Sequence, residues 1–318
     1  MFTRPMHIDV IIATHNRAAL LGRAIESLLR APAAARLDFT ITVVDNACGD
    51  ETAQLVHRLA AAATGRVRYL REPRLGKSLA VNRGIAATAG EIIALVDDDQ
   101  VMAEDWLEAV HGAIAEGFDY VTGPVAGDWE APSPRWYDGR LHGVLSLFDG
   151  GGERLPLEPD GFREIFSAGN AAIARSAIDR VGGLHPALGK ISGAFTMCED
   201  GELLLRLRRA GMRGVYEPRM AVRHRVPGER LTRRYFRRWH LGYGRSMALV
   251  DALHPRPVAY WFGLPRYLIR TAIEAIPRMA IAAARGDRPG SFLYELQLWF
   301  ILGFLCGRLR LFVKSHVH

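Results

Sequence analysis

The first 116 residues alternate between short apolar runs and stretches with helical periodicity, and this alternation constrains the fold more than any other feature. Apolar runs of strand length occupy residues 8–13, 39–44, 67–70 and 91–96. Helix-forming stretches follow them at about residues 20–29, 51–63, 77–89 and 104–116. Strands that alternate with helices of this length form a parallel sheet covered by helices. The sequence therefore predicts an α/β fold with a doubly wound, mostly parallel sheet.

The periodicity is lost between residues 122 and 162, where Gly, Pro and aromatic residues such as Trp129, Trp136 and Tyr137 are frequent. We expect an irregular segment here, and a loop of this length in a compact domain is usually functional or mobile. Order is expected to return with helices near residues 175–181 and 199–210. Short strands are expected around residues 214 and 221.

Positive charge is concentrated near the C-terminus. The chain has a formal net charge of +7, and residues 225–318 contain 16 Lys and Arg against five Asp and Glu. Such asymmetry indicates an anionic partner, either nucleic acid or the surface of a membrane. No nucleic-acid recognition motif accompanies the charge. We therefore predict a membrane surface and no nucleic acid as the partner of this region.

Two apolar stretches follow, at residues 258–284 and 291–313, and both are interrupted by charged residues. The longest clean run, residues 298–307, is about half as long as a membrane-spanning helix. We predict interfacial helices that lie on a membrane, with a helical bundle packed on the rest of the chain as the alternative. The predicted domains are residues 1–224 and a basic, apolar helical region over residues 225–318. Residues 1–9 do not resemble a signal peptide, so the expected location is the cytoplasmic face of the membrane.

Overall composition excludes several classes of protein. Apolar residues make up 49% of the chain and charged residues 24%, which is ordinary globular usage and excludes intrinsic disorder. The three cysteines, Cys48, Cys198 and Cys306, have the spacing of neither a disulfide framework nor a zinc site. The chain is therefore expected to work in a reducing compartment.

Polar side chains follow three of the predicted strands, at residues 14–17, at Asp45 and at Asp97, Asp98 and Asp99. Ligands of doubly wound sheets bind outside the carboxyl ends of the strands. Three adjacent carboxylates cost free energy unless a cation or a ligand dipole compensates them. Carboxylate ligation favours Mg²⁺ or Mn²⁺, which commonly bridge to substrate phosphates. The sequence therefore predicts a metal-dependent site for a nucleotide or a nucleotide conjugate.

Two common nucleotide-binding motifs are absent from the expected places. The first strand ends in ATHNR, without the GxGxxG pattern of dinucleotide-binding folds. The triplet Gly76-Lys77-Ser78 resembles the end of a P-loop, but the required first glycine is Arg71. Dinucleotide binding and a P-loop are therefore both disfavoured.

An ordered set of sequence segments resembles glycosyltransferase family 2, whose members have the GT-A fold. The segments are VIIATHNRAALLGRAIESLL, VVDNACGDET, LGKSLAVNRGIAATAGEIIALVDDD, SAGNAAIARSAIDRVGG and CEDGELLLRLRRAG followed by YEPRMAVRH. Together they span about residues 8–224. Each segment is weak alone, but the set in this order is specific.

The resemblance implies a role for each residue of the candidate donor site. The residues implied to bind the donor are Thr14, His15, Asn16, Arg17, Asp45, Gly76, Lys77, Asp97 and Asp98. Asp45 would accept a hydrogen bond from the N3–H of uracil or thymine. Guanine is an alternative base. Asp99, Asp97 and His224 would hold Mg²⁺ or Mn²⁺. Spacing alone favours an ordinary surface or packed histidine at position 224.

The segment Glu199-Asp200 resembles the ED motif, whose Asp is the general base of inverting members of the family. A base on the acceptor hydroxyl is what a single displacement at the anomeric carbon requires. The same carboxylates also suit the N-terminus of the helix that follows, and the two roles are compatible. Gly169 and Asn170 resemble the family's GxN segment on the acceptor side.

These observations predict a metal-dependent inverting glycosyltransferase of cell-surface polysaccharide synthesis. A UDP-sugar is the favoured donor, ahead of dTDP-rhamnose and GDP-mannose, and the acceptor is a glycan or a polyprenyl- or lipid-linked sugar. Two rival interpretations are a nucleotidyltransferase acting on sugar phosphates and a non-catalytic membrane-associated scaffold. Product detection separates them, because glycosyl transfer releases a nucleoside diphosphate and nucleotidyl transfer releases pyrophosphate.

Overall fold

The computed structural model describes residues 6–157, 166–190, 195–261 and 263–316 and forms two compact units. Unit 1 consists of residues 1–128, 147–192 and 199–225, and unit 2 of residues 129–146, 193–198 and 226–318. The C-terminal region thus starts next to the predicted boundary at residue 224. It also takes in two earlier segments that the sequence analysis placed in the N-terminal domain.

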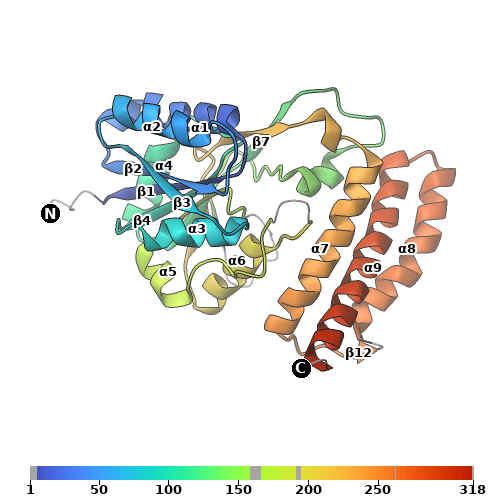
Figure 1. The fold of residues 1–318 in the computed structure, drawn as a ribbon. Coiled ribbons are helices and arrows are strands. Elements are labelled where there is room, and N and C mark those ends of the chain that lie inside the picture. The colour runs from blue at the N-terminus through green and yellow to red at the C-terminus, as the bar shows by residue number, and fades with distance from the viewer. Residues whose placement is uncertain (1–5, 158–165, 191–194, 262, 317–318) are drawn as a thin grey trace. The chain divides into compact units, whose positions relative to one another are not determined.

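Unit 1 is built on a mixed sheet of eight strands in the order β3-β2-β1-β4-β9-β6-β10-β8 (Figure 1). Strands β3, β2, β1 and β4 are parallel, β9 runs antiparallel to both β4 and β6, and β8 runs antiparallel to β10. The strands are β1 (Ile8–Thr14), β2 (Phe39–Asn46), β3 (Val67–Glu72), β4 (Ile92–Asp97), β6 (Tyr120–Thr122), β8 (Leu155–Leu157), β9 (Asn170–Ala174) and β10 (Gly214–Tyr216). The predicted mostly parallel α/β sheet is confirmed.

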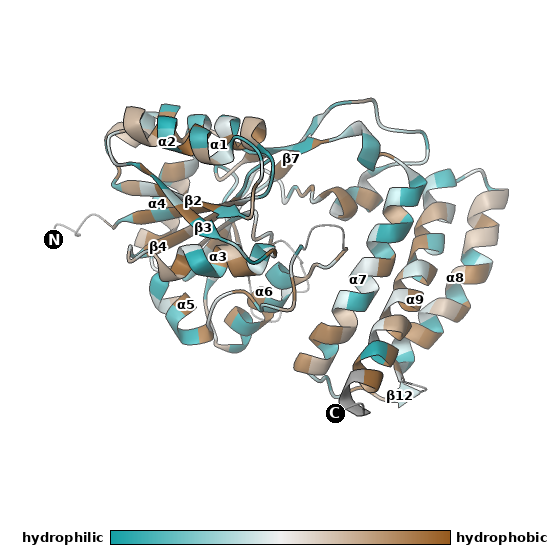
Figure 2. Ribbon diagram, in the orientation of Figure 1, coloured by the Kyte–Doolittle hydropathy of each residue, from teal (hydrophilic) through white to brown (hydrophobic). Residues whose placement is uncertain are grey.

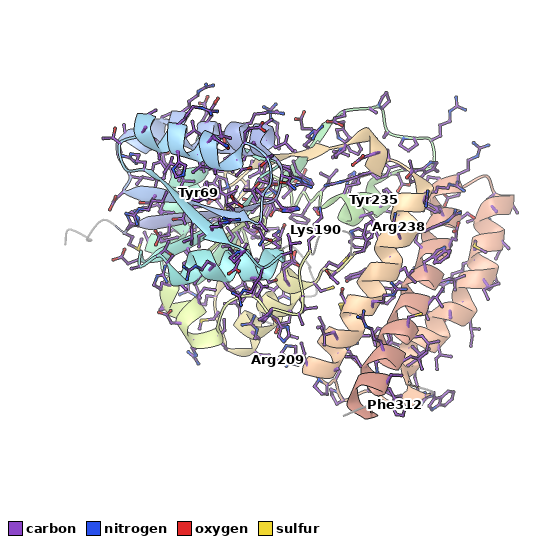
Figure 3. All side chains as sticks on the ribbon, in the orientation of Figure 1. Tyr69, Lys190, Arg209, Tyr235, Arg238 and Phe312 are labelled. Atoms are coloured by element: carbon purple, nitrogen blue, oxygen red, sulfur yellow. The ribbon has the colours of Figure 1, made fainter. Side chains whose placement is uncertain are left out.

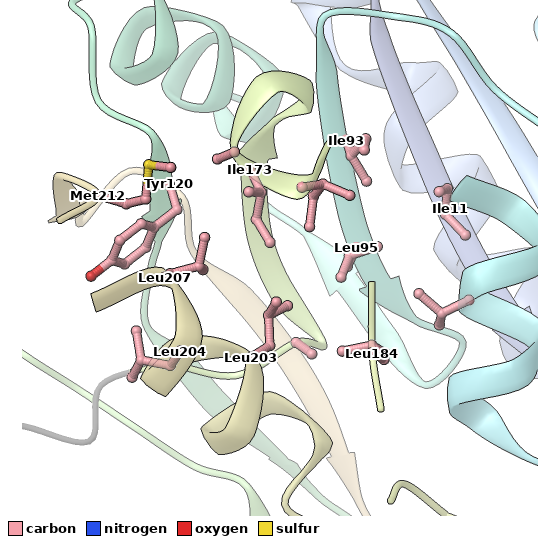
Figure 4. Close-up of a cluster of buried hydrophobic side chains, with 14 of the residues drawn as sticks. Ile11, Ile93, Leu95, Tyr120, Ile173, Leu184, Leu203, Leu204, Leu207 and Met212 are labelled. Atoms are coloured by element: carbon pink, nitrogen blue, oxygen red, sulfur yellow. The ribbon is translucent and has the colours of Figure 1, made fainter. Parts of the chain in front are cut away.

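Helices cover both faces of this sheet. Helices α1 (Ala18–Arg30) and α2 (Thr52–Ala62) lie on one face, and α3 (Lys77–Ala86), α5 (Arg175–Val181) and α6 (Glu199–Arg209) lie on the other (Figure 1). Helix α4 (Trp106–Ala115) joins β5 to β6. Apolar side chains of α6 such as Leu203 and Leu207 pack with Ile93, Leu95 and Ile173 of the strands in one buried cluster (Figure 4). This packing fixes the start of α6 on the sheet.

The segment predicted to be irregular, residues 122–162, contains several short elements. They are the end of β6, β7 (Val125–Trp129), the 3₁₀ helix η2 (Gly139–Leu145) and β8. Strand β7 joins β5 (Gln100–Met102) and β11 (Val222–Val226) in a second sheet of three strands. Strands of three to five residues carry too little periodicity to be recognised from sequence.

Unit 2 contains three long helices, α7 (Arg233–Leu253), α8 (Arg266–Ala284) and α9 (Arg288–His316), together with the hairpin of β12 (Tyr260–Trp261) and β13 (Leu264–Pro265). It also holds the short 3₁₀ helix η3 (Gly228–Arg230), while η1 (Pro32–Ala35) belongs to unit 1. Residues 129–146 join this unit because the Trp136 ring packs edge-on against Phe236 of α7 and Phe292 of α9. Phe195 likewise packs against Tyr235.

Helices α7 and α9 approach each other backbone to backbone. A Cβ at Gly244 would overlap the Phe300 carbonyl oxygen, and a Cβ at Gly303 would overlap that of Leu241. Gly307 lies in the same way against Arg245. The small residues of both helices therefore allow close packing along most of α9.

The apolar stretch that the sequence analysis regarded as interrupted is one continuous helix. Of the helices in the described part of the chain, α9 alone is long and apolar enough to cross a membrane, over Arg288–Val313. Core helices of soluble proteins meet the same criterion. Brown, hydrophobic segments also occur on α8 and near the ends of α7 and α9 (Figure 2).

Candidate functional site

Parallel pairing brings three polar loops of unit 1 together. Strand β1 lies between β2 and β4, with Thr14 opposite Asp45 and Ala13 opposite Asp97. Because the strands are in register, the residues that follow them emerge at the same edge of the sheet. The predicted donor-side residues 14–17, 45 and 97–99 therefore share one edge.

Two of the three consecutive aspartates, Asp98 and Asp99, are held by Thr14 and Arg17. The Thr14 hydroxyl donates to Asp98 Oδ2 at 2.7 Å, and Arg17 Nη1 donates to Asp98 Oδ1 and Asp99 Oδ2, both at 2.9 Å. Burial raises the pKa of the Asp98 carboxyl above its ordinary value, and Arg17 opposes that effect. Burial would lower the pKa of Arg17, but Asp98 and Asp99 raise it overall. Arg17 is therefore a permanent cation beside the aspartates.

His224 also lies beside these aspartates, with Nε2 3.3 Å from Asp99 Oδ1 and both side chains buried. Strand β11 pairs antiparallel with β5, so that His224 is opposite Gln100, and the Arg225 N–H donates to the Asp99 carbonyl at 3.0 Å. The pairing of two strands far apart in sequence therefore sets this contact.

The pair Asp99 and His224 fits a divalent cation that substrate phosphates help to bind. Among the residues that the structure describes, no three His, Cys, Asp or Glu side chains are grouped as a metal site. Mg²⁺ commonly needs only one or two protein ligands when substrate phosphates and water supply the rest. An imidazole nitrogen and a carboxylate oxygen at 3.3 Å can converge on one ion.

Asp45 is buried and hydrogen-bonded through both carboxylate oxygens. The Cys48 N–H donates to Oδ1 at 2.7 Å, and the Tyr69 hydroxyl donates to Oδ2 at 2.6 Å. Burial and the bond to Asp45 raise the pKa of Tyr69 to about 12, so the phenol stays protonated. Tyr69 lies on β3 and is labelled in Figure 3. Sequence analysis missed Tyr69, because its contact with Asp45 depends on the pairing of β3 with β2.

The loops around Asp45 are tied to one another by hydrogen bonds. His15 Nδ1 lies 2.7 Å from the Asn46 carbonyl oxygen, and the Asn16 side chain accepts from the Gly49 N–H at 2.7 Å. The Asn46 side chain accepts from the Gly76 N–H at 2.8 Å. Asn46 was not predicted as a site residue, yet it connects the end of β2 to the start of α3. Gly76 is at φ +148°, a value that side chains rarely tolerate.

Lys77, the first residue of α3, connects the aspartates with Glu199. Its Nζ lies 2.6 Å from Asp97 Oδ1 and 3.7 Å from Glu199 Oε1. Burial would lower the pKa of Lys77, but Asp97 and Glu199 raise it above its ordinary value. The ammonium is thus a permanent cation between residues that are about 100 positions apart in sequence.

Glu199 and Asp200 lie in the first turn of α6, where negative charge is favourable. Glu199 is buried, and burial raises its pKa to about 7, with Lys77 opposing and Asp200 adding to the shift. Burial also raises the pKa of Asp200, again against the effect of Lys77. Asp200 is half-buried. A carboxylate with a raised pKa is a better proton acceptor than an exposed one.

Gly169 and Asn170, predicted on the acceptor side, lie just before and at the start of β9, which pairs with β4. The Asn170 side chain is fully buried: it accepts from Trp106 Nε1 at 2.8 Å and donates to the carbonyl oxygens of Met220 and Pro124 at 2.9 and 3.2 Å. The side chain thus uses three of its four hydrogen-bonding positions inside the protein. Gly169 lies against Asp97, where a Cβ would overlap Asp97 Oδ2.

The sequence matches the model of one protein family, described as Glycosyl transferase family 2, over residues 9–182. The chain is 26% identical over 254 residues to the succinoglycan biosynthesis protein ExoM of Rhizobium meliloti, which covers 78% of this chain and 77% of ExoM. It is 23% identical over 259 residues to the glucosyl-dolichyl phosphate glucuronosyltransferase of Haloferax volcanii, covering 79% of each protein.

The fold is similar to that of solved glycosyltransferases. The mannosyltransferase PcManGT from Pyrobaculum calidifontis, solved with GDP-Man and Mn²⁺, superimposes with a TM-score of 0.58 at 20% identity. The match covers 99% of this chain and 89% of the mannosyltransferase. At this identity the likeness shows the fold alone, which is the GT-A fold.

Proposed function

The chain belongs to glycosyltransferase family 2, and we propose that it transfers a sugar from a nucleoside diphosphate donor with inversion at the anomeric carbon. One observation carries the proposal: Lys77 Nζ lies 2.6 Å from Asp97 Oδ1 and 3.7 Å from Glu199 Oε1. Glu199 directly precedes Asp200 in the sequence. The acidic pair of α6 is therefore beside the aspartates at the strand ends. An inverting transfer needs such an arrangement, because the base takes the proton of the acceptor hydroxyl that attacks the carbon from which the diphosphate leaves.

The donor nucleoside is proposed to bind along residues 14–17 and Asp45, with a UDP-sugar as the favoured donor. The remaining lone pairs of the Asp45 carboxylate suit the N3–H donor of uracil. GDP-sugars are the alternative donors, because guanine also has N–H donors and the similar mannosyltransferase is solved with GDP-Man. Arg17 and Lys77 supply positive charge for the phosphates.

A divalent cation, Mg²⁺ or Mn²⁺, is proposed to bind at Asp99 and His224, with Asp97 nearby. When bound, such an ion would stabilise the negative charge of the departing diphosphate. The fold neighbour solved with Mn²⁺ supports this assignment. Arg17 holds Asp98 and Asp99 in place through its two hydrogen bonds.

Asp200 is proposed as the general base. It takes the proton from the acceptor hydroxyl while that oxygen bonds to the anomeric carbon. The bond from this carbon to the diphosphate oxygen breaks in the same displacement, and the nucleoside diphosphate leaves. Lys77 stays charged throughout and stays paired with both Asp97 and Glu199.

The acceptor is proposed to be a glycan or a lipid-linked sugar at the cytoplasmic face of a membrane. Relatives named for succinoglycan biosynthesis and for a glucosyl-dolichyl phosphate acceptor support this class. The arginine-rich, apolar unit 2 supports attraction to an anionic membrane surface.

The donor assignment is tested by thermal unfolding with UDP, dTDP, GDP and ADP, each with and without Mn²⁺. A ligand that binds the native state raises the apparent stability by mass action. We expect stabilisation by one diphosphate, strongest for UDP, that requires Mn²⁺ and is lost in Asp99→Ala. The exposed-carboxylate variant Asp179→Asn is the matched control and should behave like the parent. Absence of stabilisation by every nucleotide in folded protein would favour a non-catalytic scaffold.

The base assignment is tested with Asp200→Asn. Loss of general base catalysis should lower product formation about 10²- to 10⁴-fold. The affinity for the donor should stay near that of the parent. A comparable loss of donor binding would remove Asp200 from the base role. Release of pyrophosphate instead of nucleoside diphosphate would identify a nucleotidyltransferase.

A further inference from the structure

Unit 2 exposes large apolar side chains at one end of its helices. They come from the end of α7, the β12–β13 hairpin with its preceding loop, and the end of α9, and we call them the apolar end: Leu253, Val258, Trp261, Leu309, Phe312 and Val313. Trp261 is 53% exposed and Phe312 61%. Phe312 is labelled at the end of α9 in Figure 3. Soluble domains rarely gather so many exposed large apolar side chains without a partner.

A buried aspartate holds the three parts of the apolar end together. Asp251 of α7 accepts from the Tyr260 hydroxyl at 2.7 Å and from Arg256 Nη2 at 3.1 Å, and Arg308 of α9 lies 3.8 Å from it. The Arg308 guanidinium also lies over the Tyr260 ring, 5.5 Å from its centre. The hairpin and the two helix ends are thus one assembled surface.

The charges around the apolar end are positive. Residues 252–266 contain Arg256 and Arg266 and no acidic residue. Residues 300–313 contain two arginines and no acidic residue. The Arg266 guanidinium lies over the Trp261 ring, 4.7 Å from its centre. Exposed Trp and Phe surrounded by arginines match the interface of a bilayer that contains anionic lipids.

The packing of α9 argues against its crossing the bilayer. Near its start, Glu295 pairs with Arg237 of α7, with Oε2 3.1 Å from Arg237 Nη2, and Gly307 lies against Arg245. Helix α7 therefore accompanies α9 from Glu295 to Arg308, and it contains five arginines. A spanning α9 would carry some of these arginines into hydrocarbon, at a cost of about 2.5–3.5 kcal/mol each at the bilayer centre.

We propose that unit 2 docks on anionic membranes through the apolar end, and that α9 stays within the folded helical unit without spanning the bilayer. This inference deepens the membrane association proposed above and rests on it. It is independent of the sugar-transfer chemistry.

The test is flotation of the full chain with vesicles of phosphatidylcholine alone and with vesicles that also contain phosphatidylglycerol. We expect binding mainly to the anionic vesicles. The double variant Trp261→Ser/Phe312→Ser should lower the partition coefficient at least about tenfold, because each large apolar side chain contributes that order of affinity. The matched control is Ile273→Ser/Ile276→Ser on α8, whose isoleucines are 67% and 58% exposed and should be dispensable.

The outcomes separate the alternatives. Equal binding of the parent and the Trp261/Phe312 variant, or loss of binding only in the α8 variant, would overturn the apolar end as the docking site. Resistance of the membrane-bound parent to alkaline carbonate extraction would show that α9 inserts. A dimer that the apolar-end substitutions dissociate, with no vesicle binding by the parent, would replace the membrane by a second copy of the chain.

Two further measurements keep these outcomes interpretable. Circular dichroism and thermal unfolding of every variant show whether it is folded. Nucleotide stabilisation measured on the same preparations separates the two proposals: vesicle binding without nucleotide binding leaves docking intact and removes the proposed transfer. Should the Trp261/Phe312 variant fail to fold, Leu309→Ser and Val313→Ser provide the same test singly.

Discussion

Replacement of the buried Asn170 by alanine is expected to destabilise unit 1 strongly. The side chain makes hydrogen bonds of 2.8, 2.9 and 3.2 Å, with the Trp106 indole and two backbone carbonyls. Each such bond contributes about 1 kcal/mol net, and a buried partner left unpaired costs about 1–3 kcal/mol. Trp106 is fully buried, so water cannot replace the bond to its indole N–H. We therefore expect a loss of about 3–5 kcal/mol.

Urea and thermal unfolding, followed by circular dichroism, measure this loss. For a unit of this size, about 3–5 kcal/mol corresponds to a decrease in Tm of roughly 10 °C. The comparison variant is Asn82→Ala, which removes two hydrogen bonds to the Leu184 backbone, of 2.7 and 2.8 Å, from a half-buried position. It should cost about 2 kcal/mol. The reasoning would be refuted by an Asn170→Ala protein that unfolds like the parent but has a raised KM for the acceptor.

Three further predictions concern the site. Burial raises the pKa of Glu199 from its ordinary value of 4.5 to about 7, so the folded state binds this proton more tightly than the unfolded state. Relative to Glu199→Gln, the parent should therefore lose about 3 kcal/mol of unfolding free energy between pH 4.5 and 7. Parallel stability profiles of the two proteins against pH would contradict this. Tyr69→Phe removes the hydrogen bond to Asp45 and should weaken nucleotide binding three- to tenfold by calorimetry, with kcat unchanged; an unaltered Kd would show that Asp45 is held without it. Gly169→Ala should displace Asp97 and lower the rate of transfer at least tenfold in a folded protein, whereas full activity would mean that Asp97 has room to move.

Sequence reasoning located the candidate site to the extent that the site is built from strand ends. Asp45 and Asp97 each end a buried apolar run, and the periodicity of those runs is a local property. The parallel arrangement then follows from the alternation with helices. The residues found in this way are those whose position depends on their own strand and its neighbours.

The surroundings of Asn170 and Tyr69 depend on contacts between distant segments. Asn170 follows a Gly in a pattern typical of an acceptor loop, but its side chain points into the protein because β9 is inserted between β4 and β6. Tyr69 acts on Asp45 across neighbouring strands. No local sequence pattern indicates either contact.

The sequence by itself determined the α/β class, the residues at the strand ends and the basic, apolar character of the C-terminal region, because strand and helix periodicity and charge are properties of neighbouring residues. Only the tertiary structure brought His224 to Asp99 and joined residues 129–146 to the C-terminal helices. It also decided that α9 packs along the arginine-rich α7. These features depend on strand register and on helix packing between residues far apart in sequence, where burial and steric fit select one arrangement among many that the local pattern allows.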